Sequence, residues 1–413
     1  MSSSNASAAS NTLGSDAKLI TLVGLAHAIS HFSQLVLPPL FPWLKDAFHV
    51  SYTELGAVLT VFFVVSCVVQ AASGFVVDRL GPRPVLFVGL GLLALAAIGY
   101  ALAQNYWMLL ASAVVAGVGN GVFHPVDYTL FNRKVAPTRL GHAYSVHGIT
   151  GSLGWALAPA FVVPLAIAFS WRVALASAGL LALVVLLVLW FNRAALSLDV
   201  KAVHKATGAD AAAGGELGFL KIPAVWMCFG FFFFYAMALS VVQTFAPAAA
   251  GHLHAVPVGL IAICLTVYMV ASAGGMLVGG FLASDPARCE RIVGLSFGAA
   301  AVVALVLALA TFPPVLVPVL FGAMGFAAGI AGPSRDLLVK RSTPANASGR
   351  VYGVVYAGLD IGQAVAPLIF GRLMDHRQYV SVIVGLAVVQ AVLIASALNV
   401  RRVRREALVP ASA

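Results

Sequence analysis

Twelve stretches of about twenty mostly apolar residues, separated by short polar segments, dominate this chain of 413 residues. A helix that crosses the hydrocarbon core of a bilayer needs about 20 such residues. Charged residues make up only 9% of the sequence, whereas a soluble domain carries roughly 25%. A soluble protein of this size could not cover its surface with so few charges. The sequence therefore predicts an all-α integral membrane protein with twelve transmembrane helices.

The predicted helices form two sets of six on either side of a long polar segment rich in Gly and Ala, a composition typical of flexible linkers. They are expected near residues 18–42, 53–77, 85–103, 107–131, 141–168 and 172–192, and then near 222–249, 256–283, 292–311, 314–338, 350–371 and 379–400. The N-terminal residues lack the basic-then-apolar order of a cleaved signal. We expect a disordered cytoplasmic tail (1–16), an N-terminal six-helix bundle (17–192), a cytoplasmic linker (193–220), a C-terminal six-helix bundle (221–400) and a cytoplasmic tail (401–413).

Lys and Arg are distributed very unevenly between the segments that join the helices. If the N-terminus lies inside the cell, 20 of the 24 Lys and Arg residues fall on inner segments. Basic residues concentrate on the cytoplasmic side of membrane proteins. This bias predicts a multi-pass protein of the inner membrane with both termini in the cytoplasm. The net charge of +10 is therefore a topology signal, and no nucleic-acid partner is expected.

The sequence offers no pattern for a cofactor or a cysteine-based site. The four cysteines form no CxxC pair, and three of them lie in apolar runs. Neither a disulfide framework nor a metal site is therefore indicated. No phosphate-binding P-loop is present, so this chain alone is not expected to be a primary pump, and no cofactor is predicted.

A weak internal repeat relates the two sets of helices. When residues 117–159 are placed on residues 325–367 without gaps, a shift of 208 positions, 12 of the 43 pairs are identical. The matches include four glycines, two prolines, an arginine and a tyrosine, which coincide by chance much less often than Ala or Leu. Each half holds six helices, so equivalent helices point the same way and the pseudo-twofold axis runs along the membrane normal. Such parallel repeats place a binding site at the interface between the halves.

Three GxxxG pairs lie within the predicted helices. They are Gly117/Gly121, Gly275/Gly279 and Gly358/Gly362. Small residues at this spacing are typical of helices whose backbones touch. None of the pairs follows a strand, as a nucleotide-binding loop would, so we interpret them as packing contacts.

The loop after the second predicted helix carries the segment "GFVVDRLGPRP". Gly74, Asp78, Arg79, Gly81 and Arg83 match the signature of the major facilitator superfamily at this loop, and this chain resembles that family over essentially its whole length. The resemblance implies a secondary transporter with two six-helix bundles. It also implies that Asp78, Arg79 and Arg83 help to close one side of the carrier.

A narrower resemblance concerns the fourth helix. The segment "VFHP", followed by a glycine-rich helix, is similar to the fosmidomycin-resistance-type branch of efflux transporters. That branch usually has an acidic residue directly after His-Pro, whereas Val126 stands here and Asp127 follows it. Many drug–proton antiporters also carry an arginine where this chain has Ala113. These departures argue against a direct copy of drug-antiporter coupling.

Polar residues inside membrane spans are expensive and usually face a cavity or one another. Several recur here at helical spacing, so that each set forms one stripe on its helix. The candidates for cavity lining or substrate contact are His27, His31, Gln34, Asn120, His124, His147, Tyr235, Gln243, Tyr356, Asp360 and Gln363. For each of them, hydrogen bonding between neighbouring helices is the alternative interpretation.

The stretch "GVFHPVDYTLFNRK" combines a helix breaker with a carboxylate. Pro125 should bend its helix, and Pro333 marks the equivalent place in the second half. The shift of 208 positions places Asp127 on Arg335, so equivalent positions carry opposite charges. We expect Pro125 and Pro333 to be hinges. Asp127 and Arg335, with the histidines of the first helix, are candidates for proton coupling near the inner mouth, and a solvated helix end is the alternative for Asp127.

The sequence thus predicts a proton-coupled secondary transporter of a small organic solute, with export favoured by the narrower resemblance. An uptake symporter for an organic acid is the alternative within this class. An integral membrane enzyme is the alternative from another class, but no catalytic motif is present. A channel is disfavoured by the twofold repeat and the few pore charges. The expected partners are the solute, protons and the lipid bilayer, and the protein is expected to be a monomer.

Overall fold

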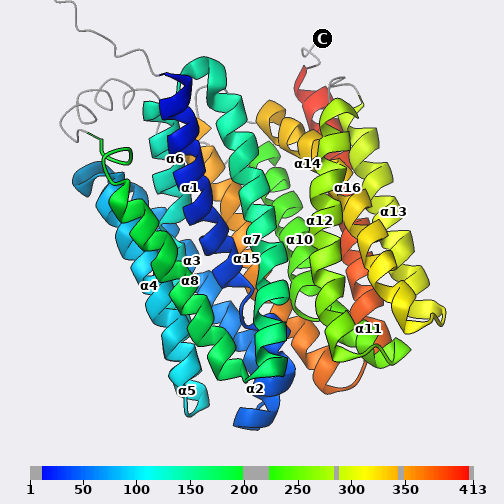
Figure 1. Ribbon diagram of the computed structural model, residues 1–413. Helices are drawn as coiled ribbons and strands as arrows, with labels where there is room; N and C mark the ends of the chain where they lie inside the picture. The colour runs from blue at the N-terminus through cyan, green and yellow to red at the C-terminus, as the bar shows by residue number, and fades with distance from the viewer. Residues whose placement is uncertain (1–11, 199–222, 283–287, 343–347, 409–413) are drawn as a thin grey trace, which may run out of the picture.

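The computed structural model describes residues 12–198, 223–282, 288–342 and 348–408, and side chains are not described over 336–356 and 396–408 or at a few other positions. The described residues fold into helices that run side by side (Figure 1). The first half consists of α1 (Leu13–Gln34), α2 (Phe41–Phe48), α3 (Tyr52–Leu80), α4 (Pro82–Leu102), α5 (Tyr106–Asn120), α6 (Phe123–Lys134), α7 (Leu140–Ala168) and α8 (Trp171–Phe191). The second half consists of α10 (Pro223–Thr244), α11 (Ala246–His254), α12 (Val258–Leu282), α13 (Cys289–Leu309), α14 (Val317–Ser342), α15 (Ser348–Asp375) and α16 (Tyr379–Leu408).

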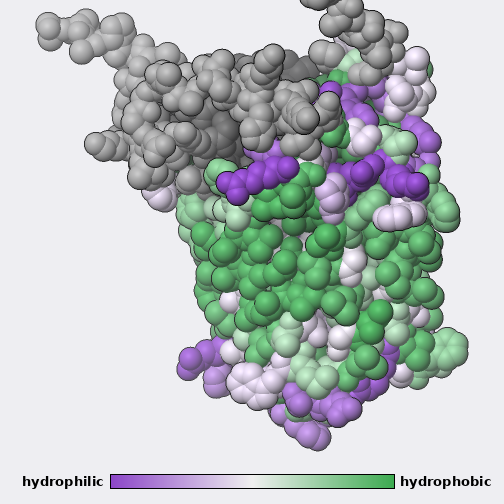
Figure 2. Space-filling model, turned by 90° about the vertical axis from the view of Figure 1, so that its left-hand side faces the viewer, coloured by the Kyte–Doolittle hydropathy of each residue, from purple (hydrophilic) through white to green (hydrophobic). Residues whose placement is uncertain are grey.

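Among the described residues, ten helical segments are long and apolar enough to cross a membrane, and α16 contains a shorter apolar helix, Tyr379–Ala395. With α15, these occupy the twelve predicted positions. The outer surface fits this assignment, since Leu95, Leu180 and Leu187 on α4 and α8 are each more than half exposed. Figure 2 shows that the surface has a broad hydrophobic belt with hydrophilic residues at both ends of the molecule. The predicted all-α membrane fold is confirmed.

The two halves repeat the same helix contacts. In the first half α1 packs on α7, α5 packs on α3, and α4 packs on α5 and α8. In the second half α10 packs on α15, α14 packs on α12, and α13 packs on α14 and α16. Each pair occupies the equivalent place in its half and runs in the same direction. This arrangement is the parallel repeat that the shift of 208 positions predicts.

The GxxxG glycines lie where helix backbones meet. A Cβ atom on Gly117 of α5 would collide with the carbonyl oxygen of Phe62 on α3, and one on Gly121, directly after α5, with that of Ser66. The second half repeats this contact, because Gly325 and Gly329 of α14 lie against carbonyl oxygens of α12. The packing interpretation of these glycines is confirmed, and such close contacts favour movement of each half as a unit.

Local signals set the boundary between α2, α3 and α4. Ser51 and Glu54 form a capping box at the start of α3, in which each side chain accepts a hydrogen bond from the other residue's backbone N–H. At the end of α3, Gly81 adopts a left-handed φ of 81°, which glycine tolerates best. Pro82 then takes the first position of α4, where a backbone donor is not needed. This explains the Gly-Pro pair of the loop motif.

The two halves meet along α3 with α15 and along α7 with α12. We call the end of the molecule that carries the two described chain ends the termini end, and the opposite end, with α2 and α11, the far end (Figure 1). At the far end the Asp375 carboxylate of α15 accepts hydrogen bonds from the backbone N–H groups of Tyr52 and Thr53, at 2.7 and 2.9 Å, and from the Thr53 hydroxyl at 2.6 Å. One residue of the second half therefore caps a helix of the first half.

Two predicted boundaries are wrong. Helix α1 begins at Leu13 instead of after residue 16, because Thr12 caps its N-terminus. Asp16 is buried and bonds Arg139, with 2.7 Å between Oδ2 and Nη2, so it belongs to the bundle. Helix α16 continues to Leu408, into the segment predicted as the C-terminal tail. Residues 1–11, 199–222 and 409–413, including most of the predicted linker, lie outside the described residues.

The first predicted span also differs in shape. Helix α1 stops at Gln34, and the chain then passes through a short turn into α2. Pro38 and Pro39 lack backbone donors, and Pro42 occupies the first turn of α2. Prolines interrupt a helix when they lie in its interior and are tolerated at its start. The single helix predicted over residues 18–42 is therefore two helices.

Candidate functional site

Four histidines and one aspartate converge inside the first half. We call His27 and His31 of α1, His124 and Asp127 of α6, and His147 of α7 the histidine cluster. Asp127 is fully buried, and His27 and His147 are almost fully buried. The alternative of Asp127 as a solvated helix end is therefore wrong. The cluster forms because α1, α6 and α7 pack together and each contributes polar residues at intervals of three or four positions.

The Asp127 carboxylate is the centre of this cluster. Its Oδ2 atom lies 3.0 Å from Nε2 of His147, with which it forms a hydrogen bond, and 3.2 Å from Nδ1 of His27. The rings of His27 and His147 stack, with their centroids 3.5 Å apart. The other carboxylate oxygen, Oδ1, is buried without a hydrogen-bond partner, as are Nδ1 of His31 and Nδ1 of His124. The cluster thus holds more polar atoms than its own hydrogen bonds satisfy.

Close packing of α7 against α1 holds two imidazoles against a glycine. A Cβ atom on Gly151 would lie 2.8 Å from Nδ1 of His31 and 3.0 Å from Nε2 of His27. Any larger residue would therefore displace both rings. Sequence reasoning missed Gly151, although its place in a glycine-rich helix next to the polar stripe was a signal.

A chain of amide and hydroxyl groups extends from the cluster toward α3. Asn120 Oδ1 accepts hydrogen bonds from Ser30 Oγ at 2.7 Å and Gln34 Nε2 at 3.2 Å, and Asn120 Nδ2 donates to Ser66 Oγ at 2.9 Å. The Trp155 indole donates to Gln34 Oε1 at 3.0 Å. Gln34 and Asn120 were both predicted as site residues, and the structure brings them together as hydrogen-bond partners of neighbouring helices.

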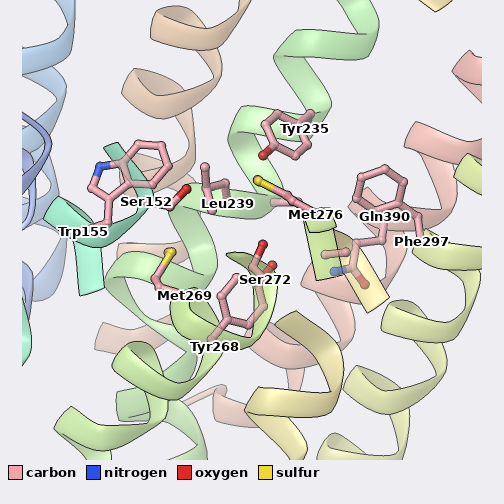
Figure 3. Close-up of a pocket in the computed structure, with 12 residues that line it drawn as sticks. Ser152, Trp155, Tyr235, Leu239, Tyr268, Met269, Ser272, Met276, Phe297 and Gln390 are labelled. Atoms are coloured by element: carbon pink, nitrogen blue, oxygen red, sulfur yellow. The ribbon is translucent and has the colours of Figure 1, made fainter. Parts of the chain in front are cut away.

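A cavity of about 20 Å³ lies where α7 of the first half meets the second half. Figure 3 shows Ser152 and Trp155 on one side and residues of α10, α12, α13 and α16, including Tyr235 and Gln390, on the others. This volume holds about one water molecule. Trp155 reaches both regions, because its ring also lies 4.3 Å from that of His31. Sequence reasoning named Tyr235 but missed Trp155.

Arg335 lies against Tyr235, one of the residues that line this cavity. Its guanidinium carbon is 4.4 Å from the centroid of the Tyr235 ring and 5.7 Å from that of Phe232, a cation–π arrangement. The sequence suggested Arg335 as a cation close to Asp127. The Asp127 carboxylate lies instead against the imidazoles of His27 and His147 in its own half, so that expectation is corrected.

The remaining candidates of the second half are divided between the interface and the core. The Asp360 carboxylate lies 3.4 Å from Gln70 Nε2 on α3 and against the Cys67 thiol on the same helix. Gln363 is buried, and its backbone oxygen accepts from Ser240. Gln243 is buried with an unpartnered Nε2. Tyr356 lies outside the residues whose side chains the structure describes.

The loop-motif charges lie apart from these sites, at the termini end. Asp78 and Arg79 are exposed at the end of α3, and Arg83 is half-buried. Among the described residues, Asp78 forms no ion pair. Their predicted role in closing this end stays a prediction.

The two predicted hinges differ in their surroundings. The fourth span is interrupted at Gly121 and Val122, and Pro125 stands in the first turn of the new helix, α6. The interruption comes before the proline instead of at it. Pro333, in contrast, lies inside the continuous helix α14. The helix is therefore interrupted near Pro125, whereas α14 runs unbroken through Pro333.

Two bundles with equivalent helix contacts, a lipid-facing apolar surface and a cavity where the bundles meet define a membrane transporter with duplicated halves. The sequence model of the Major Facilitator Superfamily matches residues 23–367 and, in a second match, residues 229–412. The chain belongs to this superfamily, and its family and fold are those of a transporter of small solutes and not of an enzyme.

Similar proteins support this assignment. An uncharacterised MFS-type transporter, YfnC, of Bacillus subtilis (strain 168) is 31% identical over 142 residues, 34% of each chain. The hexuronate transporter of the same strain is 28% identical over 177 residues, 42% of this chain and 41% of the relative. The fosmidomycin resistance protein of Escherichia coli (strain K12) is 24% identical over 141 residues, 34% of each chain. The matches thus span well under half of these relatives.

Solved structures agree over nearly the whole chain. A bacterial homolog of the human lysosomal transporter Spinster has a TM-score of 0.74 in its inward-facing, unoccupied form, with 14% identity, and the match covers 97% of this chain and 100% of that chain. Its occupied form gives a TM-score of 0.73, covering 94% and 97%. At 14% sequence identity, this similarity shows a shared fold and does not indicate a shared substrate.

Proposed function

We propose that this protein exports a small organic anion by alternating access, coupled to protons. The observation that carries the proposal is Arg335, held 4.4 Å from the ring of Tyr235, which lines the cavity between the halves. A cation beside an otherwise aromatic and neutral cavity favours a negatively charged solute. Trp155, Tyr235 and Tyr268 supply the apolar surface that an organic group would contact.

Proton coupling is assigned to Asp360. A carboxylate inside a membrane protein is costly unless it is paired or protonated, and the partners of Asp360 among the described residues, Gln70 and Cys67, are both neutral. Both partners belong to the other half. The Gln70 amide and the Cys67 thiol donate to the Asp360 carboxylate across the boundary between the halves, and protonation of Asp360 removes the charge that attracts these donors. Its proton therefore affects how firmly the halves adhere. Asp127 is less suited, because the imidazoles that flank it lie in its own half.

Export is favoured by the similarity to a resistance protein. The alternative is proton-driven uptake of an organic acid, which the similarity to a hexuronate transporter favours. Both alternatives use the same anion-binding groups and differ only in direction. The basic residues on the inner segments support placement in the inner membrane with both termini in the cytoplasm. The complete cavity within one chain supports a monomer.

Solute exchange in proteoliposomes tests this proposal. We expect a panel of organic anions, including hexuronates, to show counterflow with wild-type protein, whereas matched neutral sugars do not. Arg335→Gln should abolish anion counterflow, and Arg335→Lys should retain part of it because the charge remains. Asp360→Asn should keep counterflow but lose accumulation driven by a pH gradient. Transport of neutral sugars that does not depend on Arg335 would refute the anion assignment. Full gradient-driven accumulation by Asp360→Asn would refute the coupling assignment.

A further inference from the structure

The histidine cluster has the ligand types and spacing of a metal site. His27, His124 and His147 each offer a ring nitrogen, and these three ligand atoms lie within 4.8 Å of one another. Asp127 Oδ2 lies 3.0 Å from Nε2 of His147 and 3.2 Å from Nδ1 of His27. Three imidazole nitrogens from three helices therefore lie close together inside the first half, and the Asp127 carboxylate flanks two of these histidines.

We propose that His27, His124, His147 and Asp127 bind one divalent transition-metal cation, with Zn²⁺ as the representative ion. This inference goes beyond the transport function and does not depend on its substrate, direction or coupling.

The separations of Asp127 Oδ2 from His27 Nδ1 and His147 Nε2 are close to those of tetrahedral coordination, and the stacked rings of His27 and His147, whose centroids lie 3.5 Å apart, must separate for both to bind one ion. Zinc binds imidazole nitrogen and carboxylate oxygen at about 2.0–2.2 Å, so neighbouring ligand atoms of a tetrahedron lie about 3.3 Å apart. Asp127 Oδ2 meets this requirement with both His27 and His147. The wider spacing toward His124 requires only a side-chain adjustment, since its Nδ1 has no hydrogen-bond partner.

Unsatisfied polar atoms provide a second, independent argument. Nδ1 of His27 lies 3.2 Å from Asp127 Oδ2 but forms no hydrogen bond with it, and Asp127 Oδ1 is buried without a hydrogen-bond partner. Buried polar groups in proteins are nearly always satisfied. A cation among these atoms would satisfy them, whereas hydrogen bonds within the cluster do not.

The donor set restricts the identity of the ion. Imidazole with one carboxylate suits Zn²⁺, Co²⁺, Ni²⁺ and Cu²⁺, whereas Mg²⁺ and Ca²⁺ prefer oxygen ligands. The four ligands also belong to one half only, so movement of the halves leaves the site intact. The second half has Gly332, Arg335 and Val355 at the positions equivalent to His124, Asp127 and His147. We therefore assign a resident cation that ties α1, α6 and α7 together, and not a transported one.

The experiment uses the full chain, purified in detergent and stripped of metal with EDTA. Zn²⁺ binding is measured by calorimetry, and Co²⁺ is used as an optical probe because tetrahedral Co²⁺ absorbs strongly in the visible range. We expect one site per chain. His147→Gln, His27→Gln and Asp127→Asn should each weaken binding at least tenfold and change the Co²⁺ spectrum. His142→Gln, an exposed histidine of the same helix α7, is the matched control and should bind normally.

Folding is checked separately, so that loss of binding is interpretable. Each variant must elute as a single species and keep its metal-free melting temperature, and Asp127→Asn is included because it preserves side-chain shape. The proposal is overturned if wild-type protein binds no stoichiometric Zn²⁺, or if the cluster variants and His142→Gln bind equally well. In those cases the cluster is a hydrogen-bonded network alone. Accumulation of ⁶⁵Zn²⁺ by proteoliposomes would overturn the assignment of a resident ion.

Discussion

Replacing Asp375 with asparagine tests whether one carboxylate holds the far end of the carrier closed. Asp375 accepts three hydrogen bonds across the boundary between the halves, two from backbone N–H groups at the start of α3 and one from the Thr53 hydroxyl. A negative charge at a helix N-terminus is further stabilised by the helix dipole. Asparagine keeps the shape and one acceptor oxygen but loses the charge.

The expected magnitude follows from these contacts. Removing a hydrogen bond to a charged group typically costs about 1.5–3 kcal/mol. This loss applies only when the far end is closed, since separation of the halves breaks the contact. At about 1.4 kcal/mol per tenfold change, Asp375→Asn should shift the equilibrium toward far-end opening by roughly ten- to hundredfold. The fold itself should survive, because each half retains its own helix contacts.

Distances between the halves provide the assay. Spin labels at Gln104 and Thr311, exposed positions in far-end loops of the two halves, can be introduced after replacement of the native cysteines. Pulsed electron paramagnetic resonance should then show a population with longer distances between the labels, and this population should be larger in Asp375→Asn than in the wild-type protein. Asp46→Asn, an exposed carboxylate of α2 at the same end, is the matched control. An unchanged distance distribution in Asp375→Asn, or an equal change in Asp46→Asn, would refute the conclusion that Asp375 holds the far end closed.

Three further predictions concern other parts of the chain. Asp78→Asn should leave the melting temperature unchanged, because Asp78 is exposed, but should reduce solute flux in proteoliposomes; normal flux would remove it from the gate. Pro125→Ala should slow both counterflow and gradient-driven transport, because it favours fusion of α5 and α6 into one stiff helix; unchanged rates would show that the interruption is not a hinge. Burial, assisted by Arg377, lowers the pKa of His252, so its contribution to stability is complete above about pH 6.5 and is lost as the pH falls through the lowered pKa. His252→Phe retains the ring stacking on Tyr379 and should reduce the loss of thermal stability in detergent between pH 7 and pH 5; an identical loss in both proteins would contradict this.

The helices and some of their contact faces were predictable because they depend on local composition. Apolar runs report directly on spans, and glycine spacing reports on which helix faces touch. The repeat between residues 117–159 and 325–367 also carries over into three dimensions, since equivalent glycines lie against equivalent carbonyl oxygens. These features follow from short stretches of sequence and do not require knowledge of distant partners.

The polar partners were only partly predictable. The stripes on three helices identified His27, His124, Asp127 and His147, but not that one carboxylate oxygen would face two imidazoles. The contacts of Asp375 and Asp16 were not predicted, because their partners lie 323 and 123 positions away along the chain. Sequence spacing specifies the face of a helix, whereas the partner on another helix is decided by how the helices pack.

The interrupted fourth span gives the two halves different mechanical properties. Helix α14 runs unbroken from Val317 to Ser342, whereas its counterpart consists of α5 and α6 joined at Gly121 and Val122. A continuous helix transmits force along its axis as a rod, but a jointed one lets its two segments tilt separately. The six residues from Phe123 to Tyr128 include half of the proposed metal ligands. A cation bound there would hold α6 against α1 and α7 and so restrict its movement relative to α5. Metal binding could then change the flexibility of the first half, whereas the continuous helix α14 gives the second half no equivalent control.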